Sequence, residues 1–99
     1  MSAALEAPIP LNFEFIAPLG VEVKGAMWSC VAIPDSVAKL GSLRSVRIDA
    51  TIDGITLENV GLMPTGSGEL MISVSAALRK KLGKELGDEV RVELLRRLT

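Results

Sequence analysis

Apolar and polar residues alternate in several short stretches of this chain, as they do in strands that bury one face. The clearest alternation covers residues 46–52 and resumes, after Asp53-Gly54, over residues 55–59. Because Asp-Gly adopts positive φ easily at a two-residue turn, these stretches predict a β-hairpin over residues 48–62. Further strands are predicted by shorter alternations and by one apolar run that ends at Pro34, in residues 13–15, 70–74, 90–95 and 26–33.

Two other segments have the spacing of short helices. Residues 34–41 begin with a proline, place apolar residues three positions apart and end at Gly41. Residues 75–83 begin with Ser75, which can cap a helix, place apolar residues four positions apart and end at Gly83. The chain is therefore predicted to be mainly β, with about six strands and two short helices.

The same order of elements occurs twice. A strand leads into a short helix that ends in Lys39-Leu40-Gly41, and an alternating strand follows at residues 46–49. The second copy has Lys81-Leu82-Gly83 before residues 90–93, with a gap that is two residues longer. Two such β-helix-β units can pair around a pseudo-twofold axis and close their sheets into a small barrel without exposed strand edges.

Composition excludes most familiar active sites. The chain has 99 residues, no histidine and one cysteine, so it lacks a Ser-His-Asp or Cys-His triad, a His-ligated metal, a Cys-rich zinc site and an internal disulfide. Its 11 basic and 12 acidic residues give no broad positive field toward nucleic acid or anionic membranes.

The length and the N-terminal composition predict one domain. Residues 1–11 are rich in Ala and Pro and predict a flexible lead-in, and residues 12–97 predict a single barrel domain. The uncharged stretches are much shorter than the ~20 residues of a membrane-spanning helix, and the first residues do not read as a secretory signal. We therefore expect a cytoplasmic protein that has no membrane partner.

A series of short motifs runs through the second unit: Val74-Ser75, Arg79-Lys80, Leu82-Gly83, Gly87-Asp88 and Val90. This series resembles the swapped-hairpin half-barrel of AbrB-type transcription regulators and MazE-type antitoxins, with Ser75 where those proteins usually have proline. Motifs also occur along the whole chain: Phe13-Glu14-Phe15, Trp28, Ile33-Pro34, Ile52-Asp53-Gly54, Pro64 and Leu78-Arg79-Lys80 to Asp88. Through them, residues 12–95 more closely resemble the bacterial family called domain of unknown function 1905. This resemblance implies a double-split β-barrel in one chain and carries no catalytic assignment.

Short motifs in the chain resemble catalytic ones but lack essential parts. Ser36 and Lys39 match a serine-x-x-lysine string without its partner motifs, and the loop from Gly61 to Ser67 lacks the lysine of a phosphate-binding loop. Asp49 and Asp53 share a strand face but stand ~13 Å apart, so we expect them to solvate the outer face.

Cys30 and Trp28 lie together in the apolar run 26–33, and we expect both in the core. The cysteine should then have a raised pKa. The sequence therefore assigns no catalytic, cofactor-binding or metal-binding residue.

A basic run is the one feature that could reach phosphates. It comprises Arg79, Lys80, Lys81 and Lys84, and Arg44 and Arg47 could join it in space. Helix-dipole complementarity and solubility explain the run without any partner. We interpret the chain as a non-catalytic binding or interaction domain for a protein or small molecule. A nucleic-acid-binding regulator is the alternative, and a small enzyme without a histidine-based site is the second.

Overall fold

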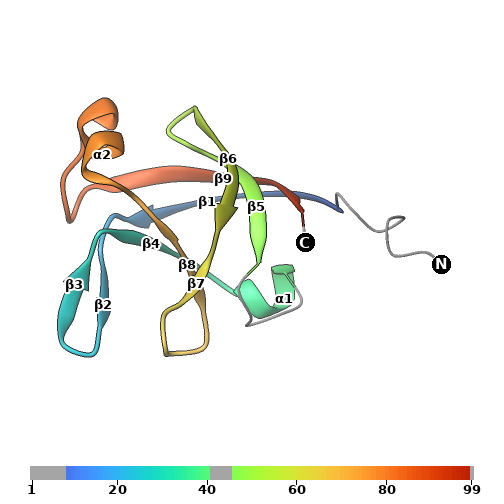
Figure 1. The fold of residues 1–99 in the computed structure, drawn as a ribbon, viewed down its shortest axis with the longest axis horizontal. Helices are drawn as coiled ribbons and strands as arrows, with labels where there is room; N and C mark the ends of the chain where they lie inside the picture. The colour runs from blue at the N-terminus through green and yellow to red at the C-terminus, as the bar shows by residue number, and fades with distance from the viewer. Residues whose placement is uncertain (1–8, 41–45, 99) are drawn as a thin grey trace.

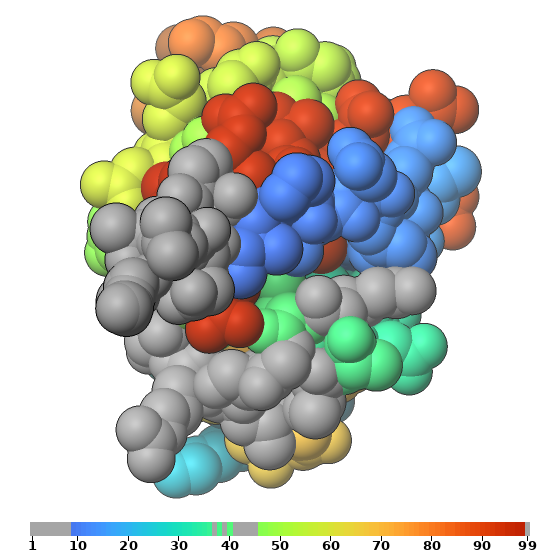
Figure 2. Space-filling view, turned by 90° about the vertical axis from the view of Figure 1, so that its right-hand side faces the viewer, coloured from blue at the N-terminus to red at the C-terminus, as the bar shows by residue number. Residues whose placement is uncertain are grey.

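The first and the last strand of the described residues pair in the largest sheet. The computed structural model describes residues 9–40 and 46–98. Its four-stranded antiparallel sheet has the order β1-β9-β5-β6 (Figure 1), formed by β1 (Ile9–Pro18), β9 (Glu89–Arg97), β5 (Arg47–Ile52) and β6 (Ile55–Gly61). Phe15 lies opposite Val92, and Figure 2 shows the blue β1 and the red end of β9 side by side on one face.

The remaining strands form two smaller antiparallel sheets. One has the order β4-β8-β7, formed by β4 (Cys30–Ile33), β8 (Leu70–Ser73) and β7 (Met63–Pro64). The other is the hairpin of β2 (Val21–Val23) and β3 (Ala26–Trp28). Helix α1 (Ser36–Leu40) follows β4, and helix α2 (Ala76–Leu82) follows β8.

The two repeats of the sequence pair with each other. β4 pairs with β8, and β5 pairs with β9. Val31 and Ile72, which hold equivalent positions in the two repeats, face each other, and so do Ala50 and Leu94. The register shifts by one residue beyond Ala50, so the correspondence is imperfect there, as in the sequence.

The mainly β class is confirmed, but none of the sheets among the described residues is closed into the double-split barrel that the sequence predicts. Single backbone hydrogen bonds bridge the sheets instead. Gly20 N donates to Cys30 O at 2.7 Å, at the point where the chain passes from β1 to β2. The two-residue β7 likewise continues the path of β6 and pairs with β8.

The core lies between the paired repeats. Apolar side chains of β4, β5, β8 and β9 form one buried cluster, which includes Ile33, Ile48, Ile52, Ile72 and Leu94, all without exposed surface. Burying each such side chain contributes about 1.5–3 kcal/mol. This burial explains why the alternating pattern fixes which face of each strand points inward.

Two local predictions are confirmed. Ile52 pairs with Ile55 across Asp53-Gly54, whose φ angles of 49° and 85° are those of a two-residue hairpin turn. Ser75 caps α2 by accepting a hydrogen bond from Leu78 N, and Gly83 ends the helix with a φ of 69°.

The prediction of one continuous strand over residues 26–33 is wrong. β3 ends at Trp28 and β4 begins at Cys30, while β3 turns back to pair with β2. The turn is Lys24-Gly25, with φ angles of 51° and 82°. In addition, β1 begins at Ile9, within the segment predicted as a lead-in.

Candidate functional site

The structure keeps most of the basic run together around α2. Lys80 and Lys81 are exposed on the helix, Arg79 is half-buried, and Lys84 follows the helix end. The buried Nε of Arg79 has no hydrogen-bond partner in the described part of the chain. The run therefore presents two exposed lysines rather than a broad cationic surface.

Arg47 does not lie with these residues. It stands at the start of β5, six residues or roughly 20 Å of strand from Asp53, which Lys84 contacts. There Arg47 Nε donates to Asn59 Oδ1 at 2.5 Å, and its NH2 group donates to the Asn59 carbonyl at 2.7 Å. Arg44 lies outside the described residues.

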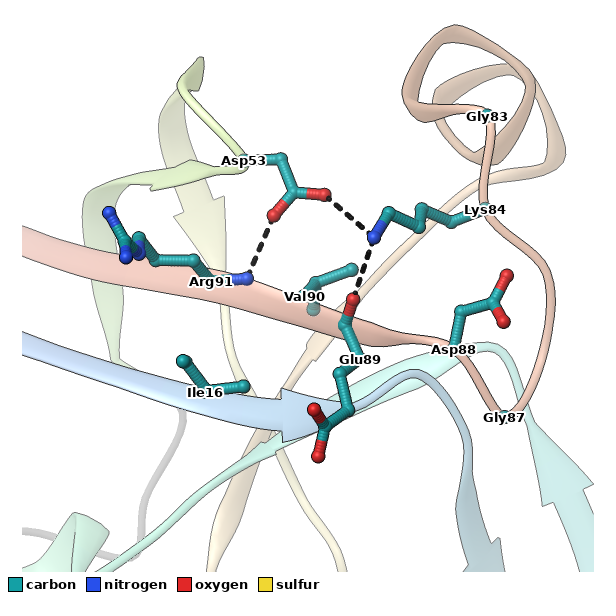
Figure 3. Close-up of a pocket in the computed structure, with 9 residues that line it drawn as sticks. All are labelled: Ile16, Asp53, Gly83, Lys84, Gly87, Asp88, Glu89, Val90 and Arg91. Atoms are coloured by element: carbon teal, nitrogen blue, oxygen red, sulfur yellow. Dashed lines mark hydrogen bonds and ion pairs between the residues drawn. The ribbon is translucent and has the colours of Figure 1, made fainter.

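The charged groups beside α2 surround a hollow of about 660 Å³ (Figure 3). Asp53 lines it: Oδ1 accepts from Arg91 N at 2.8 Å, and Oδ2 lies 3.7 Å from Lys84 Nζ. Lys84 Nζ also donates to Glu89 O at 2.9 Å. These contacts tie the β5-β6 turn to β9 and to the end of α2, so Asp53 and Lys84 in the lining of this hollow serve the fold.

A second hollow, of about 500 Å³, opens between the β2-β3 hairpin and the loop that joins β7 to β8. Both segments extend from the same end of the molecule in Figure 1. We call it the Trp28 hollow, and it is lined by Glu22, Val23, Lys24, Trp28, Pro64, Thr65, Gly66 and Ser67.

Trp28 itself is 42% exposed, so the prediction that it belongs to the core is wrong. Its strand leaves the core because β3 pairs with Val21–Val23 instead of continuing into β4. Val21 lies opposite Trp28 on this hairpin. The sequence signal for the site is the Lys24-Gly25 turn, which a reading of residues 26–33 as one strand overlooks.

The opposite wall of the Trp28 hollow is an ordered loop with two hydroxyl groups. Thr65 is 5% exposed, and its backbone N donates to Glu69 O at 2.8 Å. Thr65 Oγ1 accepts from Ser67 N at 3.1 Å and lies 2.9 Å from Ser67 Oγ. These hydrogen bonds link the loop internally, and a strand follows it, unlike a phosphate-binding loop, which a helix follows.

The nucleophile candidates are both buried. Ser36 has no exposed surface; its hydroxyl donates to Ile33 O at 2.7 Å and accepts from Leu70 N at 2.8 Å. Cys30 is 2% exposed, and burial raises the pKa of its thiol, as the sequence predicts. Both residues therefore serve the packing around β4.

The expectation that Asp49 is solvated on the outer face is wrong. It is 7% exposed, Oδ1 accepts from Asn59 N at 2.9 Å, and Oδ2 accepts from Arg96. The hydrogen bond from Asn59 N lowers the pKa of the Asp49 carboxyl; burial opposes this shift, and the hydrogen bond and charge of Arg96 add to it. Asp49 thus joins three neighbouring strands where the β5 registers shift.

Residues 9–40 and 46–98 contain neither a metal-binding cluster nor a membrane-spanning helix. No group of three or more His, Cys, Asp or Glu side chains there could hold a metal ion. No helix there has the length and the apolar character needed to cross a membrane.

Fold and site together define a small mainly β domain that carries a ligand-sized hollow with an exposed tryptophan. Residues 15–94 match the family described as "Domain of unknown function (DUF1905)", and the chain belongs to this family. The family resemblance that the sequence suggests is thereby confirmed, whereas the resemblance to AbrB-type proteins stays a prediction. No curated protein matches the chain.

Proposed function

We propose that this chain is a non-catalytic binding domain whose ligand occupies the Trp28 hollow. The observation that carries the proposal is the 42% exposure of Trp28 at a concave surface of about 500 Å³. An exposed indole forgoes the favourable burial of a large apolar ring, and ligand sites of about 300–1,000 Å³ are typically lined by such rings. A ligand seated there would bury the ring.

The non-catalytic part of the proposal is supported by how the reactive groups are used. The Ser36 hydroxyl has both a donor and an acceptor within the fold, and the Cys30 thiol is buried with a raised pKa. Asp49 and Asp53 accept hydrogen bonds from backbone N–H groups that hold strands together. None of these groups is free to act on a substrate without breaking a structural contact.

We also propose that the two repeats form a double-split barrel in a bacterial cytoplasmic protein. A pseudo-twofold arrangement is supported by the pairing of equivalent positions, because Val31 lies opposite Ile72 and Ala50 lies opposite Leu94. The bridge from Gly20 N to Cys30 O supports closure between the sheets. A single free cysteine, Cys30, is compatible with a reducing compartment.

The nucleic-acid alternative is the weaker proposal. It rests on the exposed Lys80 and Lys81, while Lys84 is already paired with Asp53, and Glu85 lies beside it in the chain. A nucleic-acid site of this kind would lose affinity steeply with added salt. Mobility shifts of DNA and RNA at low salt, with and without Lys80→Ala and Lys81→Ala, would distinguish it from the Trp28 hollow.

The test of the proposed function is a fragment screen against the full chain, followed by ¹H-¹⁵N NMR. We expect the shift changes to gather at residues 22–28 and 64–67. Trp28→Ala should abolish them, while Met27→Ala should not, because Met27 is 59% exposed and does not line the hollow. Fragments that bind only elsewhere, or equally well to the Trp28→Ala variant, would refute the site.

A further inference from the structure

The Trp28 hollow has two walls of different chemistry. One is apolar, with the exposed indole of Trp28 and the side chain of Val23 from the β2-β3 hairpin. The other comes from the loop after β7 and presents the hydroxyl-bearing Thr65 and Ser67. A ligand that fills the hollow must therefore have both a flat apolar face and hydrogen-bonding groups at its edge.

The hydroxyl pair of Thr65 and Ser67 leaves one hydroxyl hydrogen available for a ligand or solvent. Thr65 Oγ1 and Ser67 Oγ are 2.9 Å apart, and only one of their two hydroxyl hydrogens can lie between them. Thr65 Oγ1 also accepts the Ser67 backbone N–H. The second hydroxyl hydrogen has no acceptor among the described residues, and both residues line the hollow. The wall thus keeps one donor for a ligand or solvent, beside an oxygen that can accept.

The charges at the hollow do not select an ionic ligand. Glu22 and Lys24 both line it, so one carboxylate and one ammonium group balance each other toward a cation and toward an anion alike. Nucleotides would bring a phosphate to a site with one lysine. The balance favours a neutral ligand.

The number of aromatic rings in the hollow favours a saccharide over a proline-rich peptide as its ligand. Peptides in the polyproline conformation dock into grooves lined by several aromatic rings. The chain has three aromatic residues, and Phe13 and Phe15 pack on each other in β1, with ring centroids 5.6 Å apart. Trp28 is therefore the single aromatic platform of the hollow, which suits one flat ring.

We propose that the Trp28 hollow binds a pyranose ring of a neutral saccharide. The C–H groups on one face of the sugar pack against the electron-rich face of Trp28. Its hydroxyls exchange hydrogen bonds with Thr65 and Ser67, which form the opposite wall. This inference rests on the proposed function and names the ligand class for the same site.

The test uses the full chain and the neutral trisaccharides maltotriose, cellotriose and tri-N-acetylchitotriose. Trp28 is the only tryptophan and there is no tyrosine, so intrinsic fluorescence reports on the hollow alone. With at least one trisaccharide we expect a saturable change in emission and a Kd of about 1 mM or below. AMP and decaproline, as an anionic and a proline-rich probe, should give no saturable change.

Variants tie the binding to the two walls, with affinity measured by isothermal titration calorimetry. Trp28→Ala should weaken binding at least about tenfold, and Trp28→Phe, which keeps a ring, should weaken it less. Ser67→Ala removes one hydroxyl and should weaken binding about fivefold. Met27→Ala is the matched control and should leave the affinity unchanged. Circular dichroism melts check that each variant is folded.

Two results would overturn the saccharide assignment. One is the absence of a saturable response to all three trisaccharides while fragments still bind at the hollow; the other is tighter binding of AMP or decaproline there. Both leave the proposed function in place, because the hollow still takes a ligand. If neither fragments nor trisaccharides bind at the hollow, the proposed function fails as well.

Discussion

Ala50 and Leu94 allow a direct test of how the two repeats pack. They face each other across β5 and β9, and neither has exposed surface. Leu94→Ala leaves a cavity and should destabilise the domain by about 3 kcal/mol, within the usual range of about 2–5 kcal/mol for such substitutions. Ala50→Leu adds volume to the packed side of the sheet and should destabilise it by about 2 kcal/mol.

The variant that carries both Ala50→Leu and Leu94→Ala tests whether the two side chains pack against each other. Directly opposed side chains have Cβ atoms about 5 Å apart, so the new leucine can enter the space that Leu94→Ala creates. Independent effects would add up to about 5 kcal/mol, a large share of the roughly 5–15 kcal/mol that stabilises a domain of this size. We expect the double variant to lose about 2–3 kcal/mol, which corresponds to a coupling energy of at least about 2 kcal/mol.

Urea unfolding followed by far-UV circular dichroism and by Trp28 fluorescence gives these free energies. The control combines Ala50→Leu with Leu82→Ala, because Leu82 lies on α2 and is not a register partner of Ala50. The control pair should be close to additive. Additive effects for Ala50 and Leu94 would refute the facing of these residues and the packing argument built on it.

Three further predictions follow from single residues. The hydrogen bond from Asn59 N lowers the pKa of the Asp49 carboxyl from its ordinary 3.8. The ionised carboxyl therefore stabilises the fold above that pH, and this stabilisation is lost as the pH falls below it. Asp49→Asn should remove this acid dependence from the midpoint of urea unfolding. Burial raises the pKa of the Cys30 thiol above 9.0, so the stability of the fold should decrease as the pH rises beyond that value. Thermal melts of the Cys30→Ala variant should not show this decrease in stability at alkaline pH. Gly54→Ala forces a side chain into a φ of 85° and should cost about 1–2 kcal/mol, whereas Thr56→Ala on the exposed face should change the melting temperature little.

Local chemistry made some elements predictable. Asp53-Gly54 favours its turn through backbone conformations that neighbours need not impose, and the hairpin is where the sequence places it. Ser75 and Gly83 bound α2 in the same way. Cys30 also lies in the core as expected, since it belongs to the run of apolar residues that forms β4.

The candidate site was harder to predict because its residues come from separate elements. Trp28 and Cys30 are two positions apart, yet one lines a hollow and the other is buried. Lys84 looks like a member of a basic run, but Asp53, 31 positions earlier in the chain, lies 3.7 Å from its ammonium group. Charge and exposure at such positions depend on partners that spacing along the chain does not reveal.

The alternation of apolar residues, the turn and cap residues and the repeated Lys-Leu-Gly segments determined by themselves that this is a mainly β chain built on two similar units. Only the tertiary structure decided which strands pair, that the chain turns back at Lys24-Gly25, and that Trp28 faces a hollow beside Thr65 and Ser67. The physical reason is the range of the interactions. Turns and caps are satisfied by neighbouring residues, whereas strand pairing and burial are settled by contacts between segments that are distant in the sequence.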